Sequence, residues 1–173
     1  MGVSRLHASL VQSAVMVPRP IRIRRGRRTD FTAVMALLAT TNAALPSPDR
    51  ATLRRFRHLV ADLGTDFYLA TVDERIAGVA HITYARQLAD RPIATLATLI
   101  VAPGEQHDGI SSALLRFAVE RARKRACSGL RCAVRDDRDP DAAEFLTHAG
   151  AAAAGRLFEL PLPEAATGEP LEA

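Results

Sequence analysis

The sequence predicts a mixed α/β domain in which helices flank a mostly antiparallel central sheet. Strand-like and helix-like segments follow one another in the order β-α-α-β-β-β-α-β-α-β, so helices are interspersed among strands. Two apolar segments separated by the short sequence DER predict a hairpin, which makes neighbouring strands antiparallel. The chain has 173 residues, 48% of them hydrophobic, and a mean hydropathy of +0.02, as expected for one globular domain.

The segment before the hairpin contains one strand and two helices. Ile21 and Ile23 alternate with arginines, which is typical of a half-exposed strand. Thr29 and Asp30 offer capping groups to the first helix, and Gly64 is a candidate C-terminal cap for the second. The apolar stripes of the two helices consist of Phe31, Val34, Met35 and Leu38 in the first and of Leu53, Phe56, Val60 and Leu63 in the second.

The hairpin and the strand after it make up the middle of the predicted sheet. The hairpin extends from Phe67 to about Tyr84. The segment Ile93–Val101 is apolar and rich in threonine, and it carries no charge. Such a segment predicts a central strand that is buried on both faces.

The clearest helix of the chain follows the loop at 102–109. Apolar residues from Ile110 to Ala126 recur at intervals of three and four, while the opposite side of the helix is nearly all charged. We expect Gly129 to end this helix.

The remaining elements are short. The sequence LRCAV at 130–134 predicts another buried strand. Asp141 is a candidate cap for a short helix that Gly150 would stop, and residues 156–162 predict a last strand.

The two ends of the chain are expected to lie outside the folded domain. Residues 1–18 are weakly apolar and are interrupted by polar residues and proline, so they predict a disordered extension. Residues 163–173 are acidic and contain proline, and they predict a disordered tail. The domain itself is therefore expected at 19–162.

Charge and cysteine content narrow the class of protein. The net charge is +4 and the isoelectric point is about 9.8, which is compatible with an anionic ligand or with nucleic acid. No cluster of aromatic residues accompanies the basic run IRIRRGRR, which argues against nucleic acid.

Cys127 and Cys132 have no second pair and no histidine cluster nearby, so we expect reduced thiols, a cytoplasmic location and no metal site. No apolar run is long enough for a membrane span.

The loop VAPGEQHDGISSALL at 101–115 is the best candidate for a binding site. A strand that leads through a glycine loop into a helix leaves the first N–H groups of that helix without partners. Gly109 lets the main chain approach a ligand, and Ser111 and Ser112 add small donors, so the loop could hold a phosphate. The alternative is an ordinary turn between strand and helix. The spacing fits neither a P-loop nor a dinucleotide-binding fingerprint.

This loop resembles the pyrophosphate loop of the GNAT superfamily of acyl-CoA-dependent N-acyltransferases. Gln106, Gly109 and Ser111 stand at the places of its pattern, in which the last residue is usually Gly or Ala. The resemblance in element order extends over residues 20–162 and implies the acyl-CoA N-acyltransferase fold. It implies that loop amides hold the CoA pyrophosphate and that a strand backbone pairs with the pantetheine arm. The residues that it assigns to the cofactor are Leu99, Ile100, Val101, Gln106, His107, Asp108, Gly109, Ile110, Ser111 and Ser112.

The resemblance also implies a reaction, the transfer of an acetyl group from acetyl-CoA to a primary amine. The acceptor is a small molecule or a protein, and the enzyme is a monomer or a homodimer. The usual glutamate base is missing, because residues 94–101 contain no carboxylate, and Leu146 stands where a tyrosine acid is common. His81 on the preceding strand is the candidate base, since its side chain titrates near neutral pH.

Several weaker candidates and one different class of function follow from the missing residues. Tyr84, Thr95, Thr98 and His148 are the weaker candidates for holding a water or donating a proton. The different class is a non-catalytic protein of this fold that binds CoA or has a structural or regulatory role. Catalysis and mere binding are therefore both open at this point.

Overall fold

The computed structural model describes residues 19–41, 47–104, 109–134, 141–155, 158 and 160. The chain forms two compact units, Met1–Arg131 and Cys132–Ala173. The first unit contains nearly all of the sheet, and it is described first.

A five-stranded sheet with the strand order β1-β2-β3-β4-β5 forms the centre of the first unit. The strands are β1 (Arg22–Arg25), β2 (Asp66–Val72), β3 (Arg75–Ala85), β4 (Ile93–Val101) and β5 (Gly129–Cys132). The pairs β1–β2, β2–β3 and β3–β4 are antiparallel. The predicted mixed α/β fold with a mostly antiparallel sheet is therefore confirmed.

The predicted hairpin consists of β2 and β3. Asp73 and Glu74 connect the two strands with φ angles of 48° and 64°. Positive φ at both central residues is the signature of the two-residue turn whose twist matches that of the flanking strands.

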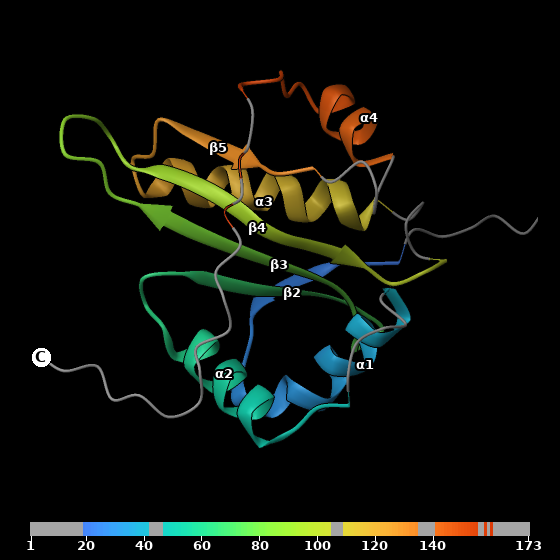
Figure 1. Ribbon diagram of the computed structural model, residues 1–173. Coiled ribbons are helices and arrows are strands. Elements are labelled where there is room, and N and C mark those ends of the chain that lie inside the picture. Colours follow the sequence, from blue (N-terminus) through green and yellow to red (C-terminus); the bar gives the residue numbers. More distant parts are fainter. Residues whose placement is uncertain are drawn as a thin grey trace, which may run out of the picture. The chain divides into compact units, whose positions relative to one another are not determined.

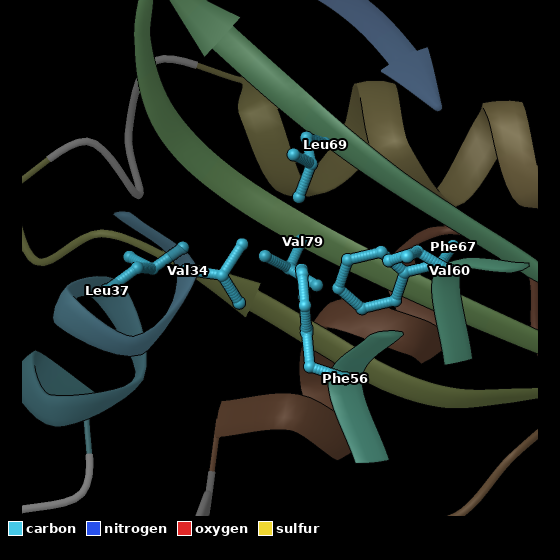
Figure 2. Packing of buried hydrophobic residues seen from close by; sticks show 7 residues of the cluster. All are labelled: Val34, Leu37, Phe56, Val60, Phe67, Leu69 and Val79. Atoms are coloured by element: carbon cyan, nitrogen blue, oxygen red, sulfur yellow. The ribbon is translucent and has the colours of Figure 1, made fainter. Parts of the chain in front are cut away.

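Helices cover both faces of the sheet (Figure 1). The short 3₁₀ helix η1 (Arg28–Asp30) leads into α1 (Phe31–Thr41), which lies with α2 (Arg50–Ala61) on one face, while α3 (Ile110–Lys124) lies on the other. The core between the sheet and the first two helices combines residues of all three (Figure 2). Its buried members are Val34, Leu37, Phe56, Val60, Phe67, Leu69 and Val79.

Side-chain caps fix the start of the two early helices. Asp30 accepts a hydrogen bond from the Arg27 N–H at 2.7 Å and two from the Arg24 guanidinium at 2.8 Å. Asp49 accepts from the Thr52 N–H at 2.7 Å and so begins α2. Asp30 thus has the capping role that the sequence predicted, although it belongs to η1 and not to α1.

Both predicted glycine caps are wrong. Helix α2 ends at Ala61, and the N–H of Gly64 donates to the carboxylate of Asp62 at 2.7 Å in the turn that follows. Helix α3 ends at Lys124, and Ala126 takes the left-handed conformation there, with φ of 54°. Gly129 is the first residue of β5 instead. Alanine can adopt this conformation at a cost of about 1 kcal/mol. A prediction that looks for a glycine therefore selects the wrong residue here.

The two strands that were expected to be buried are more exposed than predicted. Strand β4 has the predicted bounds, but several of its residues are half-buried and Ala97 is exposed. Strand β5 ends at Cys132, and its residues alternate between exposed and half-buried. The prediction of a buried strand at 130–134 was wrong because β5 is a short strand at the end of the described sheet.

A group of charged residues, the Asp66 cluster, joins the far end of α3 to the sheet. Asp66 is fully buried and accepts hydrogen bonds from Tyr84 Oη at 2.7 Å, Arg121 Nε at 2.8 Å, Arg125 at 3.2 Å and Arg25 at 3.3 Å. The Arg125 guanidinium also lies 4.2 Å from the centre of the Tyr84 ring. One buried carboxylate therefore connects β1, β2, β3 and the C-terminal end of α3.

The second unit contains α4 (Asp141–His148), which begins at the predicted cap residue. Gly150 follows this helix with φ of 88°. Of the expected last strand, Phe158 and Leu160 are described and belong to no helix or strand, while the rest of it lies outside the described residues. The predicted terminal segments 1–18 and 163–173 lie outside them too. Within the described part of the chain, no helix has the length and apolar character needed to cross a membrane.

Candidate functional site

Gly78 fixes the start of α3 against the sheet. It pairs with Val101, the last residue of β4. A Cβ atom at position 78 would lie 2.9 Å from a Leu114 methyl, 3.0 Å from an Ile110 methyl and 3.1 Å from the carbonyl oxygen of Ile100. These contacts are too close for any side chain. The absence of one lets the first turns of α3 pack directly on β3, beside the end of β4.

The first turn of α3 presents main-chain donors that no described side chain caps. Gly109 is the N-cap residue, with φ of 75°, and it has no side chain to occupy the N–H groups of the helix. The first intrahelical bond between described residues runs from the Ala113 N–H to the Gly109 carbonyl at 2.9 Å. No described heavy atom outside its neighbours lies within 4 Å of the place where a Cβ of Gly109 would be. Helix geometry leaves the N–H groups of Ile110, Ser111 and Ser112 available, with the positive end of the helix dipole behind them.

The C-terminal half of β4 extends past its neighbour β5. The Ser128 N–H donates to the Pro92 carbonyl at 2.9 Å, so the two strands begin at the same edge of the sheet. β4 has nine residues and β5 has four. Because each residue advances a strand by about 3.3 Å, β5 ends before it can pair with Leu99–Val101. This part of β4 is paired with β3 along its other edge.

A bulge in β4 lies directly before this segment. His81 pairs with Thr98 and Ile82 pairs with Leu96, so Ala97 has no partner on β3. A bulge of this kind bends the strand and increases its twist, which directs the end of β4 away from a flat sheet.

His81 lies beside this bulge, on the face of the sheet that α1 and α2 cover. Its ring packs against Phe67 with 6.1 Å between the ring centres. Nε2 is buried and has no hydrogen-bond partner among the described residues. Burial lowers the pKa of His81, and the negative charge of Asp62 at the end of α2 opposes this only in part. The imidazole is therefore neutral at pH 7 and can accept a proton.

Other predicted site residues have different surroundings. Tyr84 donates its hydroxyl to Asp66, and burial together with this bond raises its pKa well above the ordinary value. His148 is exposed on α4 in the second unit. Gln106, His107 and Asp108 lie outside the described residues.

The structure thus brings together the predicted cofactor-binding segments that it describes and places His81 apart from them. Leu99–Val101 and Gly109–Ser112 lie at the same end of the sheet, because Gly78 contacts both segments. His81 lies farther back on β3, opposite Thr98 and on the other face of the sheet from Ile110. The arrangement offers main-chain donors for an anionic group at the start of α3 and a neutral imidazole on the other face of the sheet.

Sequence reasoning missed one polar residue of this region. Thr65 precedes β2, and its Oγ1 is buried without a hydrogen-bond partner among the described residues, as is Nε2 of His81. A lone threonine before a strand carries no signal by itself. The register pairs its neighbours Asp66 and Phe67 with Ile82 and His81, and continuing it by one residue would set Thr65 beside Thr83.

A hollow among the described residues lies elsewhere, at the edge of the sheet formed by β1 and the turn between β2 and β3. It has a volume of about 810 Å³ and is lined by Pro20, Arg22, Ile23, Arg24, Thr71, Asp73 and Glu74. None of the predicted site residues lines it. The donors at the start of α3 and the neutral base on β3 identify the candidate site better than this hollow does, because they supply the chemistry that a site needs.

Comparisons with known proteins agree with the fold. The comparison with curated proteins finds no match. Among solved structures, a transcriptional regulator from Bacillus halodurans matches with a TM-score of 0.73 and 23% identity, over 83% of this chain and all of the other. A ribosomal-protein-alanine N-acetyltransferase from Brucella melitensis matches with a TM-score of 0.68 and 21% identity, over 83% of this chain and all of the other.

A third solved structure is that of an aminoglycoside N-acetyltransferase in complex with CoA. It matches with a TM-score of 0.72 and 14% identity, over 86% of this chain and 98% of the other. At such identities these likenesses show the fold alone. The model of the acetyltransferase (GNAT) family matches residues 31–151, well over half of the sequence. The chain therefore belongs to the GNAT acetyltransferase family.

Proposed function

We propose that the protein is an N-acetyltransferase that moves an acetyl group from acetyl-CoA to a primary amine of a small molecule or a protein. The observation that carries this proposal is the start of α3, which no described side chain caps, beside the end of β4, which extends past β5, in a chain of the GNAT family. The similarity to an aminoglycoside N-acetyltransferase in complex with CoA and to a ribosomal-protein-alanine N-acetyltransferase supports both the cofactor and an amine acceptor.

The residues at this end of the sheet fit CoA. The N–H groups at Gly109–Ser112 would hold the pyrophosphate, since a helix start with no capping side chain favours a dianion. The backbone of Leu99–Val101 would hold the pantetheine arm, because β5 ends before reaching it. Gln106, His107 and Asp108 belong to the same proposed site. Acetyl-CoA, when bound, supplies the thioester whose acyl carbon the amine attacks.

His81 is the proposed base. An amine must lose a proton to become an acyl amide, and strand β4 contains no carboxylate that could take it. The lowered pKa of His81 keeps its imidazole neutral at physiological pH, which is the form that accepts a proton. Holding the amine in the right orientation beside the bulge at Ala97 supplies the rest of the rate acceleration. The proposed reaction uses no dedicated acid.

The second candidate function is a non-catalytic CoA-binding or regulatory protein. The absence of a carboxylate in Ile93–Val101 and the leucine at 146 favour it, because the groups that often carry the chemistry in this family are missing. The first candidate predicts both cofactor binding and turnover, whereas the second predicts weak binding or none, and no turnover.

The experiment that tests the proposal is isothermal titration of the protein with acetyl-CoA and with CoA, followed by a screen for acetyl transfer to a panel of amines. We expect micromolar binding in the parent and none in Gly109→Trp, whose indole would cover the open donors. Gly129→Trp is the matched control, since position 129 is also open and lies at the start of β5. Binding without transfer to any amine would favour the second candidate. No binding at millimolar acetyl-CoA would contradict the acetyltransferase and the CoA-binding role, and would leave only a structural or regulatory role.

A further inference from the structure

A row of polar side chains lies beside the proposed base, on the face of the sheet toward α1 and α2. The backbone pairing defines it: His81 pairs with Phe67 and Thr98, and Thr83 pairs with Thr95. Asp66 pairs with Ile82, and its side chain contacts Arg121 on the opposite face. Successive strand residues point to opposite faces, so Thr65 points to the same face as Phe67 and His81. We call Thr65, His81, Thr83, Thr95 and Thr98 the polar row.

Two atoms of the polar row are buried and lack a protein partner. Among the described residues, Thr65 Oγ1 and His81 Nε2 are the buried side-chain oxygen and nitrogen atoms that form no hydrogen bond. Buried polar groups in folded proteins nearly always have a partner, which is either protein or an ordered water. Two such atoms on neighbouring positions of one face indicate a shared partner.

The spacing of the two residues fits a single bridging molecule. Thr65 immediately precedes β2, and continuing the β2–β3 register by one residue would make it a diagonal neighbour of His81, a relation that sets Cα atoms roughly 7–8 Å apart. One water that forms two hydrogen bonds of about 2.8 Å would span the distance between Thr65 Oγ1 and His81 Nε2. Among the described residues, Asp62 at the end of α2 is the charged group identified next to His81. A neutral molecule such as water is therefore enough to bridge His81 and Thr65.

We propose that Thr65 is a positioning residue that fixes the tautomer of His81 through one buried water. The water accepts the hydrogen of Nε2 and donates to Thr65 Oγ1. With its proton on Nε2, the imidazole keeps the lone pair of Nδ1 for the proton of the acceptor amine. This inference rests on the proposed function, in which His81 is the base, but its structural part holds in the ligand-free protein.

The tautomer can be measured without any substrate. Long-range ¹H–¹⁵N correlation spectra of the ¹⁵N-labelled protein near pH 8 report which ring nitrogen of His81 carries the proton. We expect the Nε2-protonated form in the parent and in Thr65→Ser, which keeps the hydroxyl. We expect a shift toward the Nδ1-protonated form in Thr65→Val, where the water loses its acceptor. Thr83→Val, a neighbour in the polar row, is the matched control and should resemble the parent.

Kinetics supply the second readout. In Thr65→Val we expect kcat to fall about tenfold with an unchanged KM for acetyl-CoA, and the acid limb of the pH profile to move to lower pH. The limb moves in that direction because the imidazolium loses a hydrogen-bonded neighbour. Thr65→Ser should restore both. A parent with its proton on Nδ1, or a Thr65→Val spectrum identical to that of the parent, would overturn the inference.

The two proposals fail in different ways. If the spectra behave as expected and no amine is acetylated, the water bridge stands and the proposed reaction is wrong. If acetyl transfer is found and Thr65→Val changes neither the spectrum nor the pH profile, the reaction stands and the role of Thr65 is wrong.

Discussion

At the scale of single residues, the environment of His81 suits the role proposed for it, that of a base in place of the carboxylate that β4 lacks. The side chain is half-buried, stacked near Phe67, and its pKa is lowered by burial more than Asp62 raises it. A histidine with a lowered pKa is a weaker base, but nearly all of it is in the neutral form at pH 7. This suits an acceptor amine whose own proton becomes more acidic as the new bond forms.

The first prediction concerns the removal of this base. His81→Ala should lower kcat about 100-fold with little change in the KM for acetyl-CoA, because general bases typically contribute at least this much. In the parent, kcat/KM should rise with pH through a midpoint below about 6.5, since the pKa of His81 lies below its ordinary value. This limb should vanish in the variant. Steady-state rates between pH 5 and 9 measure both.

The control for this prediction is His58→Ala, which removes an exposed histidine of α2. It should leave the rate and the pH profile unchanged. A His81→Ala variant with the rate of the parent would exclude His81 as the base.

The sequence identified some residues of the site and could not identify others. Gly109 and His81 are visible because a glycine before a helix and a histidine on a strand are signals that can be read locally. Thr65 and the partners of Asp66 depend on pairing across strands, which no local pattern reports. Tyr84 shows the opposite error. Its hydroxyl made it a candidate for holding a water or donating a proton, but this hydroxyl donates a hydrogen bond to the carboxylate of Asp66, 18 positions away.

At the scale of elements, the position of α3 controls the candidate cofactor site. The helix start lies on β3 only because Gly78 has no side chain there, and Gly78 is also the residue opposite Val101. A strand residue with no direct part in binding therefore sets the distance between the two segments that would hold the cofactor.

The second prediction tests this. Gly78→Ala would bring a methyl group to 3.1 Å from the Ile100 carbonyl oxygen, which cannot move without the strand. We expect the variant to be less stable by about 1–3 kcal/mol, as is typical of overpacking. We also expect weaker binding of acetyl-CoA, because the first turn of α3 moves away from β4. Thermal unfolding and isothermal titration measure the two effects.

Gly129→Ala is the matched control for this substitution. A Cβ at position 129 would meet no atom within 4 Å, so neither stability nor binding should change beyond the normal effect of a surface substitution. Equal cofactor affinity in Gly78→Ala and the parent would show that this contact does not set the site.

Elements as such were predictable, while their ends were less so. The bounds of β4 and the hairpin follow from apolar runs and a two-residue turn. The end of α3 does not, because Ala126 and not Gly129 adopts the left-handed conformation. The exposure of β5 could not be predicted either. An apolar run shows that a strand forms but not whether it lies at the end of the sheet.

At the scale of the whole molecule, the Asp66 cluster is the strongest link between the sheet and α3. Burial raises the pKa of Asp66, but hydrogen bonds from Arg121 and Tyr84 and the charges of Arg121 and Arg125 outweigh it, so the pKa lies below its ordinary value. A carboxylate with a lowered pKa in the folded state stabilises that state above the unfolded pKa. The stabilisation is lost as the pH falls through the folded pKa.

The third prediction follows from this link. Asp66→Asn keeps the shape of the side chain and leaves the guanidinium groups of Arg25, Arg121 and Arg125 without their shared carboxylate. We expect a loss of about 3 kcal/mol in the free energy of unfolding at pH 7, as for other buried ion pairs with one partner removed. The difference between parent and variant should begin to shrink below about pH 4, where Asp66 of the unfolded chain becomes protonated, and should be lost as the pH falls through the lower pKa of the folded state. Urea denaturation at several pH values measures it.

Asp73→Asn is the control at this scale, since Asp73 forms an exposed ion pair with Arg19 at 3.6 Å. It should change stability by less than about 1 kcal/mol. A pH-independent difference in Asp66→Asn would contradict the assigned role of the charge.

Strand β1 is the outermost strand of the described sheet, and three of its four residues are arginines. The outer edge of a sheet has main-chain N–H and C=O groups that can pair with a strand of a second molecule, which is one origin of aggregation. Two copies that met along β1 would bring rows of guanidinium groups face to face, and among the described residues Arg24 and Arg25 have carboxylates of their own that offset this in part. Mutual repulsion along this edge should therefore keep concentrated solutions free of fibrils, and added salt should weaken that protection.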